Sequence, residues 1–229
     1  VTLATPSRRP PAAAFLPLAL LRDGARACPE GPRDLVLLLD VSTSMRRRPH
    51  GPDPDRPPFG RQPRLEVALR LIRGLVEGLT PGRDRAALVE YGGETFVSTG
   101  GLAPCCAPLL EALGSLHSQS YTFPWEGLAR AVAVHEAAPA PVDLHRRAIL
   151  LVTDLAAQDL SPADQVLTQE AADLARRRGI ELLGLGIGEP VDGAFLRALA
   201  GGRASRVVLS RDLSLAPERA LADWMRCQP

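Results

Sequence analysis

The sequence predicts an α/β protein with a mainly parallel sheet, because short apolar runs alternate with longer segments of helical periodicity. The clearest apolar run is "DLVLLLD" at 34–40, which is typical of a strand buried on both faces. The clearest helix is 161–179, with Ser161 as N-cap, Pro162 at the first helical position, and Gly179 following three arginines. This alternation favours helices on both faces of one sheet.

Six strands are expected, and one of them should be a short antiparallel strand at the edge. The segment 95–98 follows a Gly-Gly turn, and a tight turn joins antiparallel neighbours. The six expected strands, each an apolar run bounded by turn residues, are 34–40, 85–92, 95–98, 147–154, 181–188 and 206–210.

Helices are expected between these strands. In 64–79 the apolar residues return at helical spacing and form one face. That face consists of Leu65, Ala68, Leu69, Ile72, Leu75, Val76 and Leu79. The other expected helices are 106–116, 125–138, 161–179, 192–200 and 214–227.

Length and composition indicate one folded domain. The chain has 229 residues, 45% hydrophobic and 23% charged, with a net charge of +1, which is enough for one sizeable core and unlike a dedicated nucleic-acid binder. The most apolar stretch, 12–21, contains Pro17 and is about half the length of a membrane span. Residues 1–33 are rich in Pro, Ala and Arg and are interpreted as a linker or leader remnant, which leaves 34–227 as the domain.

Two aspartates follow apolar strands, and their position suggests a ligand site. Asp40 ends the strand 34–40, and Asp154 ends the strand 147–154. Ligands of an open parallel sheet bind beyond the carboxyl ends of its strands, and two neighbouring carboxylates need a cation or a shifted pKa. Ser42 and Ser44 add hydroxyl oxygens beside Asp40. Such oxygen donors suit Mg²⁺ or Mn²⁺ better than zinc.

The motif "DVSTS" at 40–44 resembles the D-x-S-x-S signature of the von Willebrand factor type A family, and Met45 is a common successor in bacterial members. The resemblance covers about 34–227, and within the family the sequence is similar to secreted bacterial members. It implies a Rossmann-like, doubly wound fold. It also implies a metal-ion-dependent adhesion site, which in this family adds a threonine from a later loop and an aspartate from a following strand. Those residues correspond to Thr122 and Asp154 here, with Ser120 as a neighbouring hydroxyl that can take the place of Thr122.

The resemblance implies binding through a metal. Asp40, Ser42, Ser44 and Thr122 would hold a divalent cation directly or through water, with Asp154 acting mostly through water. Mg²⁺ is the first expectation, and Mn²⁺ or Ca²⁺ are alternatives. One coordination position would remain open for an aspartate or glutamate of a partner protein.

A monomeric binding module is therefore expected rather than an enzyme. A hydrolase based on Ser42 or Ser44 would need a histidine base, and the sequence places none beside them. Two alternatives stay open. The domain can be a regulatory or assembly module working with a AAA+ ATPase, or it can keep the fold without using the metal for binding.

Bulky residues surround Thr122 where the family often has small ones. Tyr121, Phe123 and Trp125 can shape a partner surface around the metal. Phe123 and Trp125 can equally pack into the helix that they precede.

The four cysteines bear on the compartment. The resemblance to extracellular family members implies a bond between Cys28 and Cys227 that ties the two ends of the domain together. Cys105 and Cys106 are adjacent and can bond each other or stay reduced. An extracytoplasmic, secreted or cell-surface location is expected, and four reduced thiols in a cytosolic protein is the alternative.

Overall fold

The computed structural model describes residues 31–46, 63–117, 119–138, 145–188, 191–203 and 206–210. Several expectations lie outside these residues, namely the segment 1–30, most of the loop at 46–63, the helix at 214–227, and the bond between Cys28 and Cys227.

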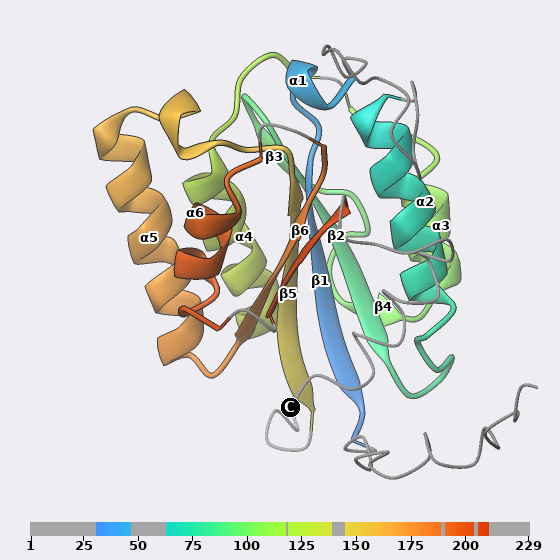
Figure 1. Ribbon diagram of the computed structural model, residues 1–229. Coiled ribbons are helices and arrows are strands. Elements are labelled where there is room, and N and C mark those ends of the chain that lie inside the picture. Colours follow the sequence, from blue (N-terminus) through green and yellow to red (C-terminus); the bar gives the residue numbers. More distant parts are fainter. Residues whose placement is uncertain are drawn as a thin grey trace, which may run out of the picture.

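One mixed sheet forms the centre of the domain (Figure 1). Its strands are β1 (Arg33–Asp40), β2 (Arg85–Tyr91), β3 (Thr95–Val97), β4 (Ala103–Pro104), β5 (Arg146–Thr153), β6 (Glu181–Gly186) and β7 (Val207–Leu209). The order is β3-β2-β1-β5-β6-β7, and β4 pairs with β2. All neighbours are parallel except β3 and β4, which run antiparallel to β2. The expected α/β fold with an antiparallel edge strand is confirmed, and β4 is an addition too short for a sequence pattern to reveal.

Helices cover both faces of the sheet, as predicted. On one face lie α2 (Arg64–Val76) and α3 (Ala107–Ala112), and on the other lie α4 (Pro124–Ala137), α5 (Pro162–Arg177) and α6 (Gly193–Leu199) (Figure 1). A short helix, α1 (Thr43–Arg46), follows β1, and a 3-10 turn, η3 (Ala157–Asp159), follows β5. Neither of these two short helices was predicted.

The core has two layers, because alternate residues of each strand point to opposite faces. In β1, Leu35, Leu37 and Leu39 pack towards α2 and α3, whereas Val36 and Leu38 pack towards the other helices. Every one of these side chains is buried. This explains why the strand is a continuous apolar run rather than an alternating one.

Helix ends agree with the local sequence signals. Ser161 accepts a hydrogen bond from the backbone N–H of Asp164 at 3.1 Å, so it caps α5 as expected. Gly179 has a φ of +67° just beyond the helix, a conformation that glycine adopts without steric cost. The helix α3 is shorter than predicted, because Gly114 and Ser115 donate to carbonyls only three residues back and so leave the α-helical pattern.

The order in which strands are added to the sheet reverses at β1. The chain first adds β2 and β3 on one side of β1, and it then adds β5, β6 and β7 on the other side. Such a switch point opens a crevice beyond the carboxyl ends of the two strands, and ligands of this fold class bind there. No helix in the described part of the chain is both long and apolar enough to cross a membrane.

Candidate metal centre

The structure brings four of the five predicted metal-site residues together at this switch point. Asp40 ends β1 and Asp154 follows β5, and these strands pair with Leu39 opposite Val152. The Ser44 hydroxyl donates to Oδ1 of Asp154 at 3.0 Å.

The two serine hydroxyls complete the cluster. The Ser44 Oγ lies 2.9 Å from the Ser42 Oγ. The backbone N–H of Ser42 donates to Oδ1 of Asp40 at 3.0 Å, so the motif turns back on its own aspartate. Four oxygen-bearing side chains therefore converge from two chain segments that are about a hundred residues apart.

Two further residues hold the Asp40 carboxylate in place. Thr153 Oγ1 donates to Oδ2 of Asp40 at 2.7 Å, and the Tyr91 hydroxyl donates to the same oxygen at 3.3 Å. Sequence reasoning did not include either residue in the site. Their positions in the sequence could have indicated them, because each is the last residue of a strand adjacent to β1.

Asp40 has an unusually high pKa. Burial raises the pKa of Asp40 from 3.8 to about 6, and the negative charge of Asp154 adds to the effect. Hydrogen bonds from Ser42 and Thr153 act in the opposite direction but do not offset burial. Asp40 forms no ion pair with any residue in the described part of the chain. A carboxylate that is buried without a positive partner favours a bound cation.

Asp154 differs from Asp40 because it has a positive partner. The Arg64 guanidinium forms an ion pair with Oδ2 of Asp154. Arg64 is the first residue of α2 and follows a proline-rich loop, and no motif marks it. Only the packing of α2 beside the end of β5 brings it to the site.

Thr122, the fifth predicted ligand, lies on a loop that is attached to both sides of the site. The Thr43 hydroxyl donates to the backbone carbonyl of Gln119 at 3.1 Å, and the backbone N–H of Phe123 donates to the carbonyl of Gly92 at 3.1 Å. The Thr122 side chain is partly buried and forms no hydrogen bond with another described residue. The structure thus places its loop beside the cluster without joining Thr122 to it.

The aromatic residues around Thr122 differ in exposure. Tyr121 is 69% exposed, and its ring stacks on that of Phe123 with the centroids 6.4 Å apart. Phe123 and Trp125 are partly buried, so they contribute to packing as well as to the surface. Ser120, the alternative to Thr122, is exposed.

The donor set suits a hard divalent cation. The cluster offers carboxylate and hydroxyl oxygens, and it contains neither thiolate nor imidazole among the described residues that surround it. Mg²⁺, Mn²⁺ and Ca²⁺ prefer such oxygens. The residues present therefore fit a metal site of the expected kind.

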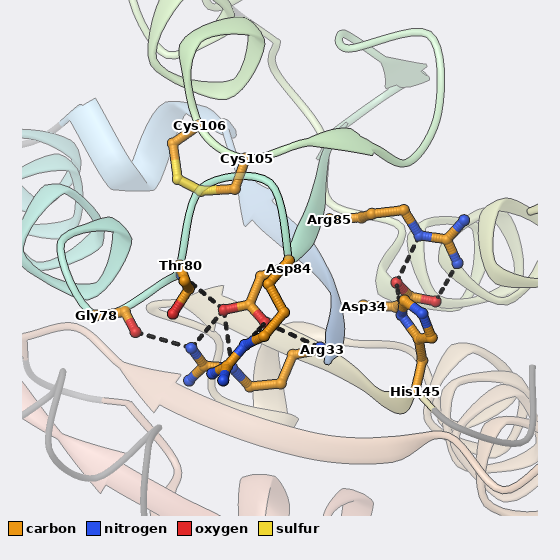
Figure 2. A network of polar contacts seen from close by, with 10 residues as sticks. Arg33, Asp34, Gly78, Thr80, Asp84, Arg85, Cys105, Cys106 and His145 are labelled. Carbon is orange, nitrogen blue, oxygen red and sulfur yellow. Dashed lines mark hydrogen bonds and ion pairs between the residues drawn. A yellow bond between two sulfur atoms is a disulfide. The ribbon is translucent and has the colours of Figure 1, made fainter. Parts of the chain in front are cut away.

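The adjacent cysteines lie elsewhere, near the amino end of β2. Their sulfur atoms are side by side (Figure 2), and the backbone N–H of Cys105 donates to the carbonyl of Asp84 at 2.9 Å. A bond between Cys105 and Cys106 stays a prediction. Cys28 and Cys227 lie outside the described residues.

An oxygen-lined site at the switch point of a doubly wound sheet defines an α/β ligand-binding domain. The family model for the von Willebrand factor type A domain matches residues 34–218, and the chain belongs to this family. No curated protein matches the chain at the level of sequence.

Solved structures share the fold. BatB from Bacteroides thetaiotaomicron is 20% identical with a TM-score of 0.61, and the match covers 84% of this chain and 97% of that one. Manganese-loaded TRAP protein from Plasmodium vivax is 18% identical with a TM-score of 0.60, over 86% of this chain and 74% of that one.

A third similar structure has its metal-ion-dependent adhesion site occupied by zinc. It is proximal thread matrix protein 1 from the mussel byssus, 17% identical with a TM-score of 0.60, and the match covers 84% of this chain and 45% of that one. The chain therefore spans less than half of the mussel protein.

Proposed function

We propose that this domain is a metal-ion-dependent protein-binding module and not an enzyme. Asp40, Ser42 and Ser44 would hold a divalent cation together with Asp154, and Thr122 would approach from its loop. The observation that supports this most is the hydrogen-bonded convergence of the two serines and the two aspartates at the switch point. Mg²⁺ is the cation we propose, with Mn²⁺ and Ca²⁺ as alternatives.

The partner would be a protein that offers an aspartate or glutamate. A divalent cation bound here would supply an electrophilic centre that accepts a carboxylate oxygen. Few charged ligands would reach the cation directly, because Asp154 already accepts from Ser44 and pairs with Arg64. The exposed Tyr121 beside the site provides a surface that such a partner can contact.

The similar structures support this proposal. One is manganese-loaded and another carries zinc in its adhesion site. The mussel protein is a thread matrix protein, which agrees with an extracytoplasmic location for this domain. We include that location in the proposal, together with a monomeric state.

The test is calorimetric titration of Mg²⁺ and Mn²⁺ into chelator-treated protein, with Asp40→Ala and Asp159→Asn beside the wild type. Asp159 is an exposed carboxylate in the 3-10 turn after β5, so it controls for the loss of a negative charge near the same edge. We expect saturable binding that disappears in Asp40→Ala and persists in Asp159→Asn. The absence of binding by the wild type at millimolar cation would sink the adhesion mechanism and leave the fold standing.

A second measurement tests the open coordination position. Mn²⁺ bound to the protein relaxes the protons of exchanging water, and acetate serves as a carboxylate probe. We expect acetate to lower this relaxation by replacing a bound water. Unchanged relaxation with saturating Mn²⁺ would argue against a free position for a partner's carboxylate.

One observation favours the alternative in which the fold does not use its metal. Arg64 already pairs with Asp154, so part of the site's negative charge is neutralised by the chain itself. The acetate measurement separates the two functions, because a domain of that kind would not take up a carboxylate at the cation, whether or not it binds the cation.

A further inference from the structure

We propose that Arg64 is a resident counter-cation of the metal centre, which neutralises Asp154 in the metal-free protein and sets the cation concentration needed to load the site. The inference rests on the proposed function and adds a residue that regulates it.

Both oxygens of the Asp154 carboxylate have partners. Oδ2 pairs with Nη1 of Arg64, and Oδ1 accepts from the Ser44 hydroxyl at 3.0 Å. The side chains of Arg64 and Asp154 are only 13% and 4% exposed, so solvent screens this ion pair weakly. A cation that uses Asp154, directly or through water, has to share or displace these contacts.

The position of Arg64 is built into the fold. Gly188, in the turn after β6, has a φ of +77°, and a Cβ there would lie 2.9 Å from Nε of Arg64 and 3.3 Å from its Cδ. The backbone N–H of Gly188 donates to the Ser210 hydroxyl at 3.0 Å, which fixes this turn to the end of β7. The arginine side chain therefore packs closely against the backbone of this turn, at a position where the positive φ favours glycine.

The neutralisation is incomplete, because Arg64 balances one of two buried carboxylates. Asp40 forms no ion pair with the described residues, so the three charged groups together keep a net negative charge that attracts a divalent cation. Removing Arg64 would leave two carboxylates that have no opposing charge among the residues that the structure describes. At short range in a weakly screened site, one unit charge changes the affinity for a divalent cation by roughly ten- to a hundredfold.

The experiment titrates Mg²⁺ and Mn²⁺ into chelator-treated protein with Arg64→Met, Arg64→Lys and Arg73→Met beside the wild type. Arg73 is an exposed arginine on the same helix, so its substitution removes the same charge away from the site. We expect Arg64→Met to bind the cation about ten- to a hundredfold more tightly, and Arg73→Met to change affinity by less than about twofold. Arg64→Lys keeps the positive charge and should lie close to the wild type.

A second readout needs no metal. In urea unfolding of the metal-free protein, Arg64→Met should lower the stability of the wild type but have little effect in an Asp154→Asn background, because the ion pair is then already lost. An equal loss in both backgrounds would mean that Arg64 acts by packing alone, and would overturn the inference.

The outcomes separate this inference from the proposed function. If the wild type binds the cation and Arg64→Met binds it equally or more weakly, the inference falls and the proposed function stands. If only Arg64→Met binds, the proposed function falls, while the counter-cation role of Arg64 is supported because the arginine alone keeps the cation out. If no variant binds, both fail.

Discussion

The two ends of β1 carry the same residue type in opposite electrostatic settings. Asp34 near the start of the strand is 2% exposed and Asp40 at its end is 0% exposed. Burial raises the pKa of each carboxyl, yet the pKa of Asp34 ends below its ordinary value and that of Asp40 ends at about 6. Burial alone therefore does not decide the pKa of these aspartates. Their charged and hydrogen-bonding partners do.

At the amino end of the sheet the two buried aspartates that the structure describes, Asp34 and Asp84, each pair with an arginine (Figure 2). Arg85 donates to both oxygens of Asp34 at 2.8 and 2.6 Å, and Nδ1 of His145 lies 3.0 Å from the same carboxylate. Asp84 accepts from the Arg33 backbone and guanidinium and from the backbone N–H of Thr80 at 2.7 Å. These bonds outweigh burial and lower the pKa of both aspartates.

At the carboxyl end of the sheet, one of the two buried aspartates of the site lacks a charged partner among the described residues. Asp154 pairs with Arg64, whereas the donors to Asp40 in the described part of the chain are all neutral. The difference agrees with a structural role for the amino end and with the cation site that we propose at the carboxyl end. Opposite responses to removing a carboxylate are therefore expected at the two ends.

The largest effect is expected at the amino end. Asp84→Asn leaves the partly buried Arg33 guanidinium without its charged partner and should lower the free energy of unfolding by about 3 kcal/mol. Urea unfolding measures this loss, and Asp159→Asn on the surface should change stability by less than about 0.5 kcal/mol. If Asp84→Asn lowers the free energy of unfolding as little as Asp159→Asn does, the contrast between the two ends of β1 is refuted.

A smaller effect of opposite sign is expected at Asp40. In metal-free protein at pH 7, Asp40→Asn removes a buried charge whose pKa is raised to about 6, while it retains an acceptor for the Ser42 N–H. The substitution should raise the free energy of unfolding by about 1–2 kcal/mol, after part of the gain is lost through weaker hydrogen bonds. Urea unfolding in the presence of a chelator tests this, and destabilisation would show that Asp40 is already satisfied without a cation.

The smallest effects are expected in the pH dependence, with separate windows for the two ends. The folded-state pKa of Asp84 lies below 3.8, so its contribution is complete above that value and is lost as the pH falls below it. The folded-state pKa of Asp40 lies above 3.8, so the gain in Asp40→Asn should be complete above about pH 6 and vanish as the pH falls towards 3.8. Urea unfolding of the wild type, Asp84→Asn and Asp40→Asn across this pH range measures both windows. If the stabilities of the three proteins change in parallel with pH, the assignment of the windows to Asp84 and Asp40 is refuted.

The predicted fold followed from local signals. The apolar runs, the helical periodicity and the caps of α5 depend on near neighbours in the chain, and the structure confirms the α/β architecture built on them. The position of Asp40 and Asp154 beyond two strand ends could also be predicted, because parallel strands bring their carboxyl ends to one edge. Whether β1 and β5 are neighbours was not visible in either strand.

The sequence by itself determined the motif residues and their oxygen chemistry, since Asp40, Ser42 and Ser44 lie within five consecutive positions. The tertiary structure alone decided which partners each carboxylate received. Arg64 reaches Asp154 across 90 positions and Arg33 reaches Asp84 across 51. Such pairs depend on helix packing and strand order, which no local pattern encodes. They determine that the aspartate at the start of β1 has charged partners, whereas the aspartate at its end has none among the described residues.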